Sequence, residues 1–138
     1  MQFGFDRRTY QPEDIVVQDS PIHGRGVFAN RSFKAGELIE IAPLILLDSP
    51  ERELLQTTKL FHYYFLIGDP QFPVALGLGY SSLYNHAGKS NAQYSVSLKD
   101  SALLIRACKP IAAGDEITLN YNGSPDDETP VQFPAVTI

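Results

Sequence analysis

The apolar positions of this chain fall in short runs separated by turn-forming residues, a pattern typical of small β-strands. The apolar runs are residues 15–17 and 27–29, and the intervening turns are residues 24–26 and 34–36. A longer apolar run over residues 37–47 predicts a third strand region. Pro43 should interrupt it, because proline cannot donate a hydrogen bond to a strand ladder. The N-terminal part of the chain is therefore predicted to be β.

One helix is predicted, beginning just after residue 48. Ser49 can cap it, Pro50 suits the first helical position, and the acidic side chains of Glu51 and Glu53 oppose the helix dipole. We expect about three turns, ended by Gly68 and the prolines that follow it. One face should be buried, and its apolar members are Leu54, Leu55, Phe61, Tyr64 and Phe65.

The C-terminal half of the chain alternates apolar runs with polar turns. From Ala92 to Tyr121 this pattern predicts a β-meander whose strands cover residues 94–98, 102–107 and 117–119. The tail, residues 123–138, contains prolines and three consecutive acids, so we expect it to be loop-like and partly mobile.

Composition narrows the class of protein. A chain of 138 residues with 43% apolar residues has room for one domain, whose core we place at about residues 15–122. Its apolar runs are far shorter than the roughly 20 residues that span a bilayer, so no membrane segment is expected. The single cysteine, Cys108, can form neither an internal disulfide nor a cysteine-rich zinc site, which favours an intracellular setting, cytoplasmic or nuclear.

The net charge of −5 bears on possible partners. Nucleic-acid binding draws on phosphate attraction to basic residues, so direct binding of nucleic acid is not expected. An acidic surface suits a basic peptide, although modest negative charge often serves solubility alone.

The first candidate binding segment is Gly24-Arg25-Gly26, which follows a predicted strand. Glycines let the backbone turn sharply and approach a ligand closely, yet a lone Gly-x-Gly is usually a tight hairpin. The segment lacks the third glycine of a dinucleotide fingerprint and the Gly-Lys-Ser/Thr of a phosphate loop. Both nucleotide readings are rejected.

The second candidate is Asn85-His86, which pairs an amide with an imidazole. This pair can bind a polar cofactor, and the competing structural interpretation is an Asx-type turn with a capping histidine. A metal site is not expected, because the three histidines have neither ligand spacing nor carboxylate or cysteine companions.

The third candidate is Tyr121, at the end of the segment 114–121. Strand alternation puts it on one face with Ile117 and Leu119. If Tyr121 has only a structural role, it is an aromatic side chain at the edge of the core whose hydroxyl faces water. No Gly-x-Ser-x-Gly elbow and no cysteine–histidine spacing support hydrolase chemistry.

Taken in order, the three segments resemble the SET domain family of protein-lysine methyltransferases over about residues 15–122. Residues 23–29, His-Gly-Arg-Gly-Val-Phe-Ala, look like the family's Gly-x-Gly motif. Residues 84–92 look like its Asn-His motif, and residues 109–121 look like its Lys-Pro-Ile…Gly-Glu-Glu-Ile-Thr…Tyr motif. The segment 75–86 and the short insert between Leu47 and Val74 are similar to the compact bacterial and viral branch.

The resemblance implies a mostly β fold of several small antiparallel sheets, with one short helix and a C-terminal segment threaded through a loop near the Asn-His motif. The chain departs from the family pattern at a few positions, which are Ser82, Ala87, Gly88, Ser90 and Asn120. None of these removes a group that the chemistry requires. The cysteine-rich zinc module that often follows the domain is absent.

The activity implied by the resemblance is transfer of a methyl group from S-adenosylmethionine to a lysine of a protein or peptide, with a histone-like tail as the natural guess. The catalytic residues would be Tyr121 and Tyr63, with Tyr64 as the competitor of Tyr63. The cofactor would contact Gly24, Arg25, Gly26, Asn85, His86 and Phe133.

Two further expectations accompany this assignment. Unprotected sheet edges and an uncovered apolar cofactor site predict a homodimer. The alternative function is an inactive module of the same fold that holds a peptide or cofactor without turnover. Retention of Asn85, His86 and Tyr121 favours activity, whereas Ala87, Gly88 and Asn120 keep the alternative open.

Overall fold

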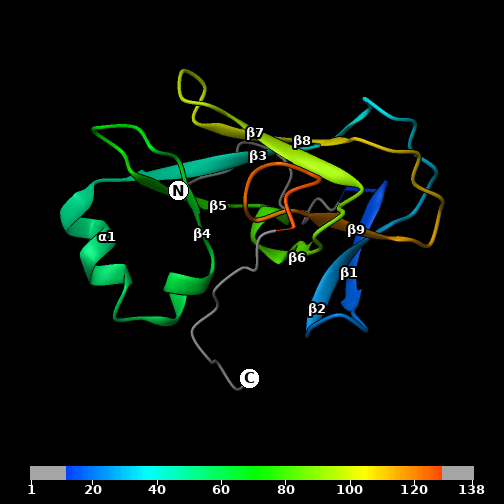
Figure 1. The fold of residues 1–138 in the computed structure, drawn as a ribbon, viewed down its shortest axis with the longest axis horizontal. Helices are drawn as coiled ribbons and strands as arrows, with labels where there is room; N and C mark the ends of the chain where they lie inside the picture. The colour runs from blue at the N-terminus through cyan, green and yellow to red at the C-terminus, as the bar shows by residue number, and fades with distance from the viewer. Residues whose placement is uncertain (1–11, 129–138) are drawn as a thin grey trace, which may run out of the picture.

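The computed structural model describes residues 12–128 and is mostly β, as predicted (Figure 1). A four-stranded sheet has the order β1-β2-β9-β6, and a five-stranded sheet has the order β4-β5-β3-β8-β7. The strands are β1 (Ile15–Asp19), β2 (Arg25–Ala29), β3 (Leu38–Leu47), β4 (Tyr64–Leu66), β5 (Val74–Gly77), β6 (Asn85–His86), β7 (Ala92–Ser97), β8 (Ala102–Ala107) and β9 (Glu116–Leu119). One α-helix, α1 (Ser49–Leu55), and two 3-10 helices, η1 (Lys59–His62) and η2 (Ser81–Leu83), complete the described elements.

The two N-terminal strands form the predicted hairpin. β1 pairs antiparallel with β2, with Ile15 opposite Ala29. Gly24, in the connection, has φ +48°, a left-handed conformation that glycine adopts without steric cost. Ile15, Val27 and Ala29 are buried in a cluster that also takes side chains from the five-stranded sheet. Side chains of both sheets therefore share one buried cluster.

The prediction that Pro43 interrupts the third strand is wrong, because β3 runs through it. On one side β3 pairs with β8 as far as Pro43 and Ala102, and on the other side it pairs with β5 from Leu44 onward. Pro43 therefore lies where the pairing passes from one neighbour to the other. Its missing N–H costs little there, and its carbonyl accepts a hydrogen bond from the Leu78 N–H at 2.9 Å.

The predicted helix is real but shorter than expected. Asp48, not Ser49, is its N-cap and forms a capping box with Glu51. After seven residues the helix ends, where the hydroxyls of Thr57 and Thr58 donate to the carbonyls of Leu54 and Leu55. These local bonds compete with helix propagation.

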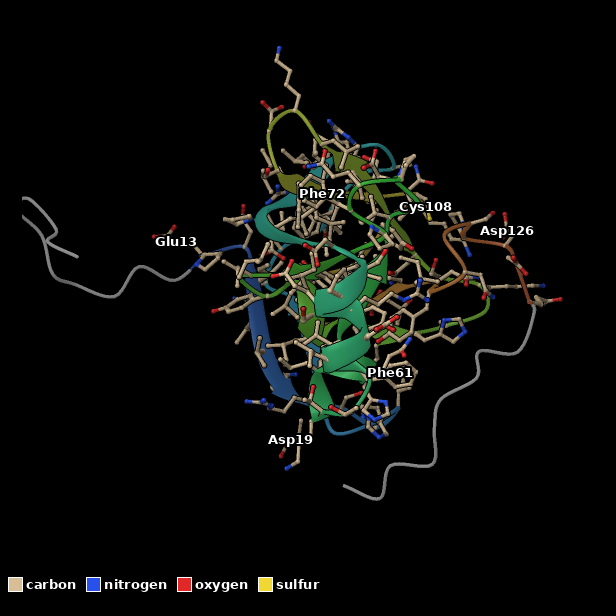
Figure 2. All side chains as sticks on the ribbon, turned by 90° about the vertical axis from the view of Figure 1, so that its left-hand side faces the viewer. Glu13, Asp19, Phe61, Phe72, Cys108 and Asp126 are labelled. Atoms are coloured by element: carbon tan, nitrogen blue, oxygen red, sulfur yellow. The ribbon has the colours of Figure 1, made fainter. Side chains whose placement is uncertain are left out.

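The predicted buried face of the helix is also wrong. No residue of α1 is buried, and the helix lies at the outer edge of the molecule, on the left in Figure 1 and toward the viewer in Figure 2, where Phe61 is labelled beside it. Tyr64 and Phe65 belong to β4, which pairs with Leu76 and Ala75 of β5. Pairing with β5 therefore outweighs the helical spacing of these aromatic residues.

The predicted meander is half right. β7 and β8 form the expected hairpin, but β9 leaves that sheet and pairs antiparallel with β2 and parallel with β6. The free edge of β8 is already taken by β3, so β9 has no partner position there. The last strand thereby joins the sheet that holds the first candidate segment.

The chain that follows β9 packs on the loop that follows β6. The Asn120 side-chain amide donates to the carbonyls of Gly88, at 3.0 Å, and Asp127, at 2.6 Å. The Ser90 N–H donates to the Pro125 carbonyl at 3.1 Å. The resemblance implied that the C-terminal segment is threaded through a loop near the Asn-His motif; these bonds join the two segments, and the threading itself stays a prediction. Asn120, one of the departures from the family pattern, has a structural role in their packing.

Candidate active site

The three candidate segments, far apart in the sequence, meet in the four-stranded sheet. β9 lies between β2, which contains Gly26, and β6, which is Asn85–His86 (Figure 1). Asn91 links the following loop to β9, because its side chain donates to the Glu116 carbonyl and accepts from the Thr118 N–H, both at 2.9 Å. The sheet therefore brings together the residues that the motifs predicted as one site.

The Asn85 side chain is held by acceptors alone. Its Nδ2 donates to the carbonyls of His23 at 2.9 Å and Arg25 at 3.1 Å, and to Glu116 Oε2 at 2.9 Å. Carbonyl and carboxylate oxygens cannot donate, so the NH₂ group of Asn85 must face them. The amide oxygen, Oδ1, then points away from these three acceptors. Three acceptors share two protons, which makes the site rich in acceptors and short of donors.

Glu116 is a site residue that the sequence reasoning did not single out. Its carboxylate accepts from the Ser20 hydroxyl at 2.7 and 2.9 Å, in addition to Asn85. Ser20 Oγ in turn accepts from the Ile22 N–H at 2.9 Å, so the turn before β2 is tied to β9. The signal for Glu116 was its place in the Gly-Asp-Glu run, where strand alternation puts it on the face opposite Ile117.

The two glycines of the first segment are required for different reasons. Gly24 needs its left-handed backbone, and a Cβ there would meet nothing within 4 Å. At Gly26 a Cβ would lie 2.4 Å from Glu116 Oε2 and 3.0 Å from Asn85 Nδ2. The tight-hairpin interpretation therefore holds at Gly24, whereas Gly26 is required by close packing against Glu116 and Asn85; the predicted approach of the backbone to a ligand stays a prediction.

Substitution of Gly26 by alanine should disrupt the site without breaking the strand. The added methyl group occupies the space of the Glu116 carboxylate and must displace it from Asn85 and Ser20. Because the Glu116 carboxylate can swing aside, the cost should appear less in stability than in binding, and we expect the affinity for the S-adenosylmethionine that the resemblance implies to fall about tenfold, or about 1.4 kcal/mol. Isothermal titration calorimetry with S-adenosylmethionine measures it.

Gly88→Ala is the matched control for this substitution, because a Cβ at Gly88 meets only ordinary contacts with Glu128, at 3.8 and 3.9 Å. It should bind like the wild type. Equal affinities for the two alanine variants would show that the close approach at Gly26 has no part in binding.

Tyr121 lies beside Asn85 and His86, with most of its side chain buried. Its hydroxyl donates to the Tyr84 carbonyl, and its backbone N–H donates to His86 Nδ1 at 3.0 Å. Burial, and then the neighbouring Tyr63 and Glu116, raise the pKa of Tyr121 to about 12. The hydroxyl is therefore protonated at neutral pH and bonded to the protein. The expectation for a purely structural Tyr121, a hydroxyl facing water, is wrong.

Tyr63 approaches Tyr121 closely enough to contribute to this rise in pKa. It caps the C-terminus of η1, and its side chain remains partly exposed. Tyr64, the competing candidate, packs edge-to-face on Phe61 with ring centroids 5.7 Å apart. This electrostatic influence on Tyr121 favours Tyr63 as the second wall of a lysine channel, and its role stays a prediction.

His86 has its ring engaged within the fold. Its Nδ1 accepts from Tyr121, and the two rings lie 5.1 Å apart between centroids. Burial lowers the pKa of the imidazole and so favours its neutral form, and the bond from the Tyr121 N–H selects the tautomer in which Nδ1 accepts. The predicted contact of the His86 backbone with adenine stays a prediction.

The remaining site predictions concern Phe133 and metal. Phe133, the candidate for packing on adenine, lies outside the described residues. Within residues 12–128, no group of three or more His, Cys, Asp or Glu side chains is arranged to hold a metal ion. No helix in that range is long and apolar enough to cross a bilayer.

Comparison with known proteins identifies the family. The SET domain model matches residues 24–122. A Schizosaccharomyces pombe protein named histone-lysine N-methyltransferase, H3 lysine-37 specific, is 28% identical over 108 residues, which are 78% of this chain and 72% of that protein.

Solved structures agree with this match. A Plasmodium falciparum protein named as a histone methyltransferase superposes with a TM-score of 0.64 at 28% identity, covering 82% of this chain and 96% of that one. The structure of ctPRC2, from Chaetomium thermophilum, bound to S-adenosylmethionine has a TM-score of 0.61 at 24% identity. That match covers 79% of this chain but only 15% of the other, and it bears on the fold alone. Protein-lysine methylation is the activity that the family match and the relatives support, and the resemblance drawn from the three motifs is confirmed: the chain belongs to the SET domain family.

Proposed function

We propose that this chain takes a methyl group from S-adenosylmethionine and transfers it to a lysine side chain of a histone-like protein. The observation that carries the proposal is the acceptor-rich cluster around Asn85, next to the Tyr121 hydroxyl. The cofactor supplies the methyl group, made electrophilic by its attachment to a sulfonium. The chain's own residues must bind the cofactor, admit the lysine and orient its amine.

The cluster around Asn85 fits the amine of the cofactor. An ammonium brings three donors and a positive charge to a place where the carbonyls of His23 and Arg25 and the Glu116 carboxylate share one amide group. The Asn85 Oδ1, on the other branch of the amide, is a further acceptor at the edge of this cluster. Gly26 keeps a side chain out of this space. His86 and Phe133 are proposed for the adenine, on the resemblance alone.

Tyr121 is proposed to orient the substrate amine. Its hydroxyl donates its proton to the Tyr84 carbonyl, and a hydroxyl that donates its proton can also accept through its lone pairs. They can accept an N–H bond from the incoming amine and thereby direct the lone pair of the nitrogen. With a pKa of about 12, this hydroxyl is not a base at neutral pH, so orientation is the role that remains.

Deprotonation of lysine then depends on the channel. At pH 7 the neutral amine lies about 4.6 kcal/mol above the ammonium, since the reference pKa is about 10.4. A channel walled by Tyr63 and Tyr121 removes water from the ammonium and lowers its pKa. Alignment of the reacting atoms in such a channel can supply about 7–11 kcal/mol of the acceleration.

Cofactor binding tests the proposal directly. After exhaustive chelation of metals, S-adenosylmethionine should still raise the melting temperature, because at 100 times its dissociation constant a ligand stabilises the fold by about 2.7 kcal/mol. Mass spectrometry of histone peptides incubated with methyl-labelled cofactor should then detect methyl-lysine. Absence of both signals would refute the proposal, and binding that returns only with added zinc would refute metal independence.

A histone tail as substrate is supported by the names of the relatives and by the net charge of −5, which suits a basic peptide. Such a substrate would place the enzyme inside the cell. The departure at Asn120 does not oppose turnover, because its side chain is occupied with Gly88 and Asp127 while the Tyr121 hydroxyl is held independently by Tyr84.

A homodimer is the proposed assembly. The outer face of the five-stranded sheet exposes Ile41 (59%) and Ile45 (44%), which lie opposite Leu104 and Leu76. Burial of such a row against a second copy would remove apolar surface from water. The wild type should therefore sediment as a species larger than 15.3 kDa at micromolar concentration.

Ile45→Lys should shift this species toward the monomer. Leu54→Lys, on the exposed surface of α1, is its matched control, since Leu54 is 70% exposed and lies outside the sheet. A single wild-type species at the monomer mass would contradict the dimer.

A further inference from the structure

Glu40 is a mostly buried carboxylate on β3 that neither the motifs nor the cofactor cluster includes. Its Oε1 accepts from the Tyr84 hydroxyl at 2.8 Å, and its Oε2 accepts from the Tyr80 N–H at 2.9 Å. A Cβ at Gly79 would lie 2.6 Å from Oε2, so the backbone of this loop is closed tightly around the carboxylate. Burial raises the pKa of Glu40, as expected of a carboxyl group taken out of water.

Tyr84 connects this carboxylate to the active site. Its side chain is only 1% exposed and ends on Glu40, while its backbone carbonyl receives the Tyr121 hydroxyl. Asn85 follows it directly, but the amide of Asn85 is held separately by His23, Arg25 and Glu116. Displacement of the Tyr84 ring should therefore move the carbonyl that faces Tyr121 more than it moves the cofactor amide.

We infer that Glu40 is a positioning residue for methyl transfer, which acts through Tyr84 to hold the carbonyl that orients the Tyr121 hydroxyl. The inference rests on the proposed function and extends it to a residue on the other sheet. A buried carboxylate costs desolvation energy unless hydrogen bonds compensate it. The Tyr80 N–H and the Tyr84 hydroxyl supply that compensation. Tyr84 is thereby held at its side chain by Glu40 and at its backbone carbonyl by Tyr121.

Substitutions that keep or remove this bond test the inference. Tyr84→Phe keeps the buried ring and deletes the bond to Glu40, and Glu40→Leu deletes both of its bonds. A misplacement of about 1 Å at a reacting group costs up to about 10²-fold, so we expect kcat to fall about tenfold or more, with unchanged affinity for S-adenosylmethionine. Glu40→Gln should restore kcat, because its amide can donate to the Tyr84 hydroxyl while its carbonyl accepts from Tyr80.

Coupling to Tyr121 separates positioning from a purely structural role. In a Tyr121→Phe background no hydroxyl remains to be oriented, so Tyr84→Phe should reduce kcat no further. Effects that multiply in the double variant, or a lowered melting temperature with unchanged kcat, would overturn the inference. Glu37→Gln, at a partly exposed carboxylate bonded to Arg31 at 2.9 Å, is the matched control and should leave kcat unchanged.

A readout without turnover keeps this result distinct from failure of the proposed function. Ionisation of Tyr121 can be followed by absorbance as the difference between each protein and its Tyr121→Phe counterpart. A hydrogen bond donated by the neutral hydroxyl raises the pKa, so the pKa of Tyr121 should fall from about 12 in Tyr84→Phe if its carbonyl moves. An unchanged pKa would overturn the inference even if the wild type is active, and a lowered pKa would support it even if no lysine is methylated.

Discussion

Tyr121→Phe is expected to slow methyl transfer by about 10²–10³-fold, or about 2.7–4 kcal/mol, the typical cost of removing one oriented hydrogen-bonding group at a reacting centre. The ring, which packs 5.1 Å from His86 between centroids, is retained, so the fold should be retained as well. The backbone bond from Tyr121 to His86 Nδ1 does not involve the hydroxyl and should persist. The loss should therefore appear in kcat, with the affinity for S-adenosylmethionine unchanged.

Single-turnover mass spectrometry on a peptide mixture measures this rate, and calorimetry measures the affinity. A phenylalanine variant that methylates at the wild-type rate, with the same distribution of products, would show that Tyr121 is only a packed aromatic. Tyr94→Phe is a suitable control, because burial likewise raises the pKa of Tyr94, which packs on Phe65 with ring centroids 5.1 Å apart. It should not reproduce the loss of rate.

Asn85→Ala is expected to show the opposite pattern, a loss of cofactor affinity of about 1.5–3 kcal/mol, the usual range for hydrogen bonds to charged groups. The substitution removes the Oδ1 proposed for the ammonium. It also leaves the carbonyls of His23 and Arg25 and the Glu116 carboxylate without their shared donor. At saturating cofactor much of the rate should return, because Tyr121 is held by Tyr84 and His86 independently of this amide.

Asn30→Ala is the matched control for Asn85→Ala. The Asn30 side chain also donates to a backbone carbonyl, that of Glu13 at 3.1 Å, but it is exposed at the open end of the β1–β2 hairpin, opposite the connection that carries His23. Equal losses of affinity in the two variants would mean that Asn85 acts through stability alone. A large fall in kcat at saturating cofactor would instead assign Asn85 a role in the transfer step.

The sequence predicts elements well where the determining contacts are local. The β1–β2 hairpin and the β7–β8 hairpin follow from apolar runs and turns, and the start of α1 follows from Pro50 and the acids near it. The end of α1 was mispredicted, because the hydroxyls of Thr57 and Thr58 stop the helix and β5 recruits Tyr64 and Phe65 into a strand. Side-chain competition and strand pairing of this kind leave no periodic signal.

The candidate site, too, could be predicted where the signal is local and not where it depends on contacts between distant residues. Gly26, Asn85 and Tyr121 could be named because each lies in a recognisable motif. Glu116 and Ser20 form part of the same cluster but are 96 residues apart, and Glu40 and Tyr84 are 44 apart. Nothing in the run Leu-Ile-Glu-Ile around Glu40 distinguishes a buried structural acid from a solvent-facing one. Such partners become visible only when the sheet order is known.

The parallel pairing of β6 with β9 also bears on the order of folding. Glu116 lies 31 residues after Asn85 and 96 after Ser20, so the acceptor cluster closes only when the last strand inserts between β2 and β6. Non-local contacts of this kind form slowly, because the chain loses conformational entropy on closing the long loop before the contacts stabilise it. A chain in which β9 is still undocked lacks the cluster that we propose for the cofactor amine. S-adenosylmethionine should accordingly slow unfolding of the finished protein and leave its rate of folding almost unchanged.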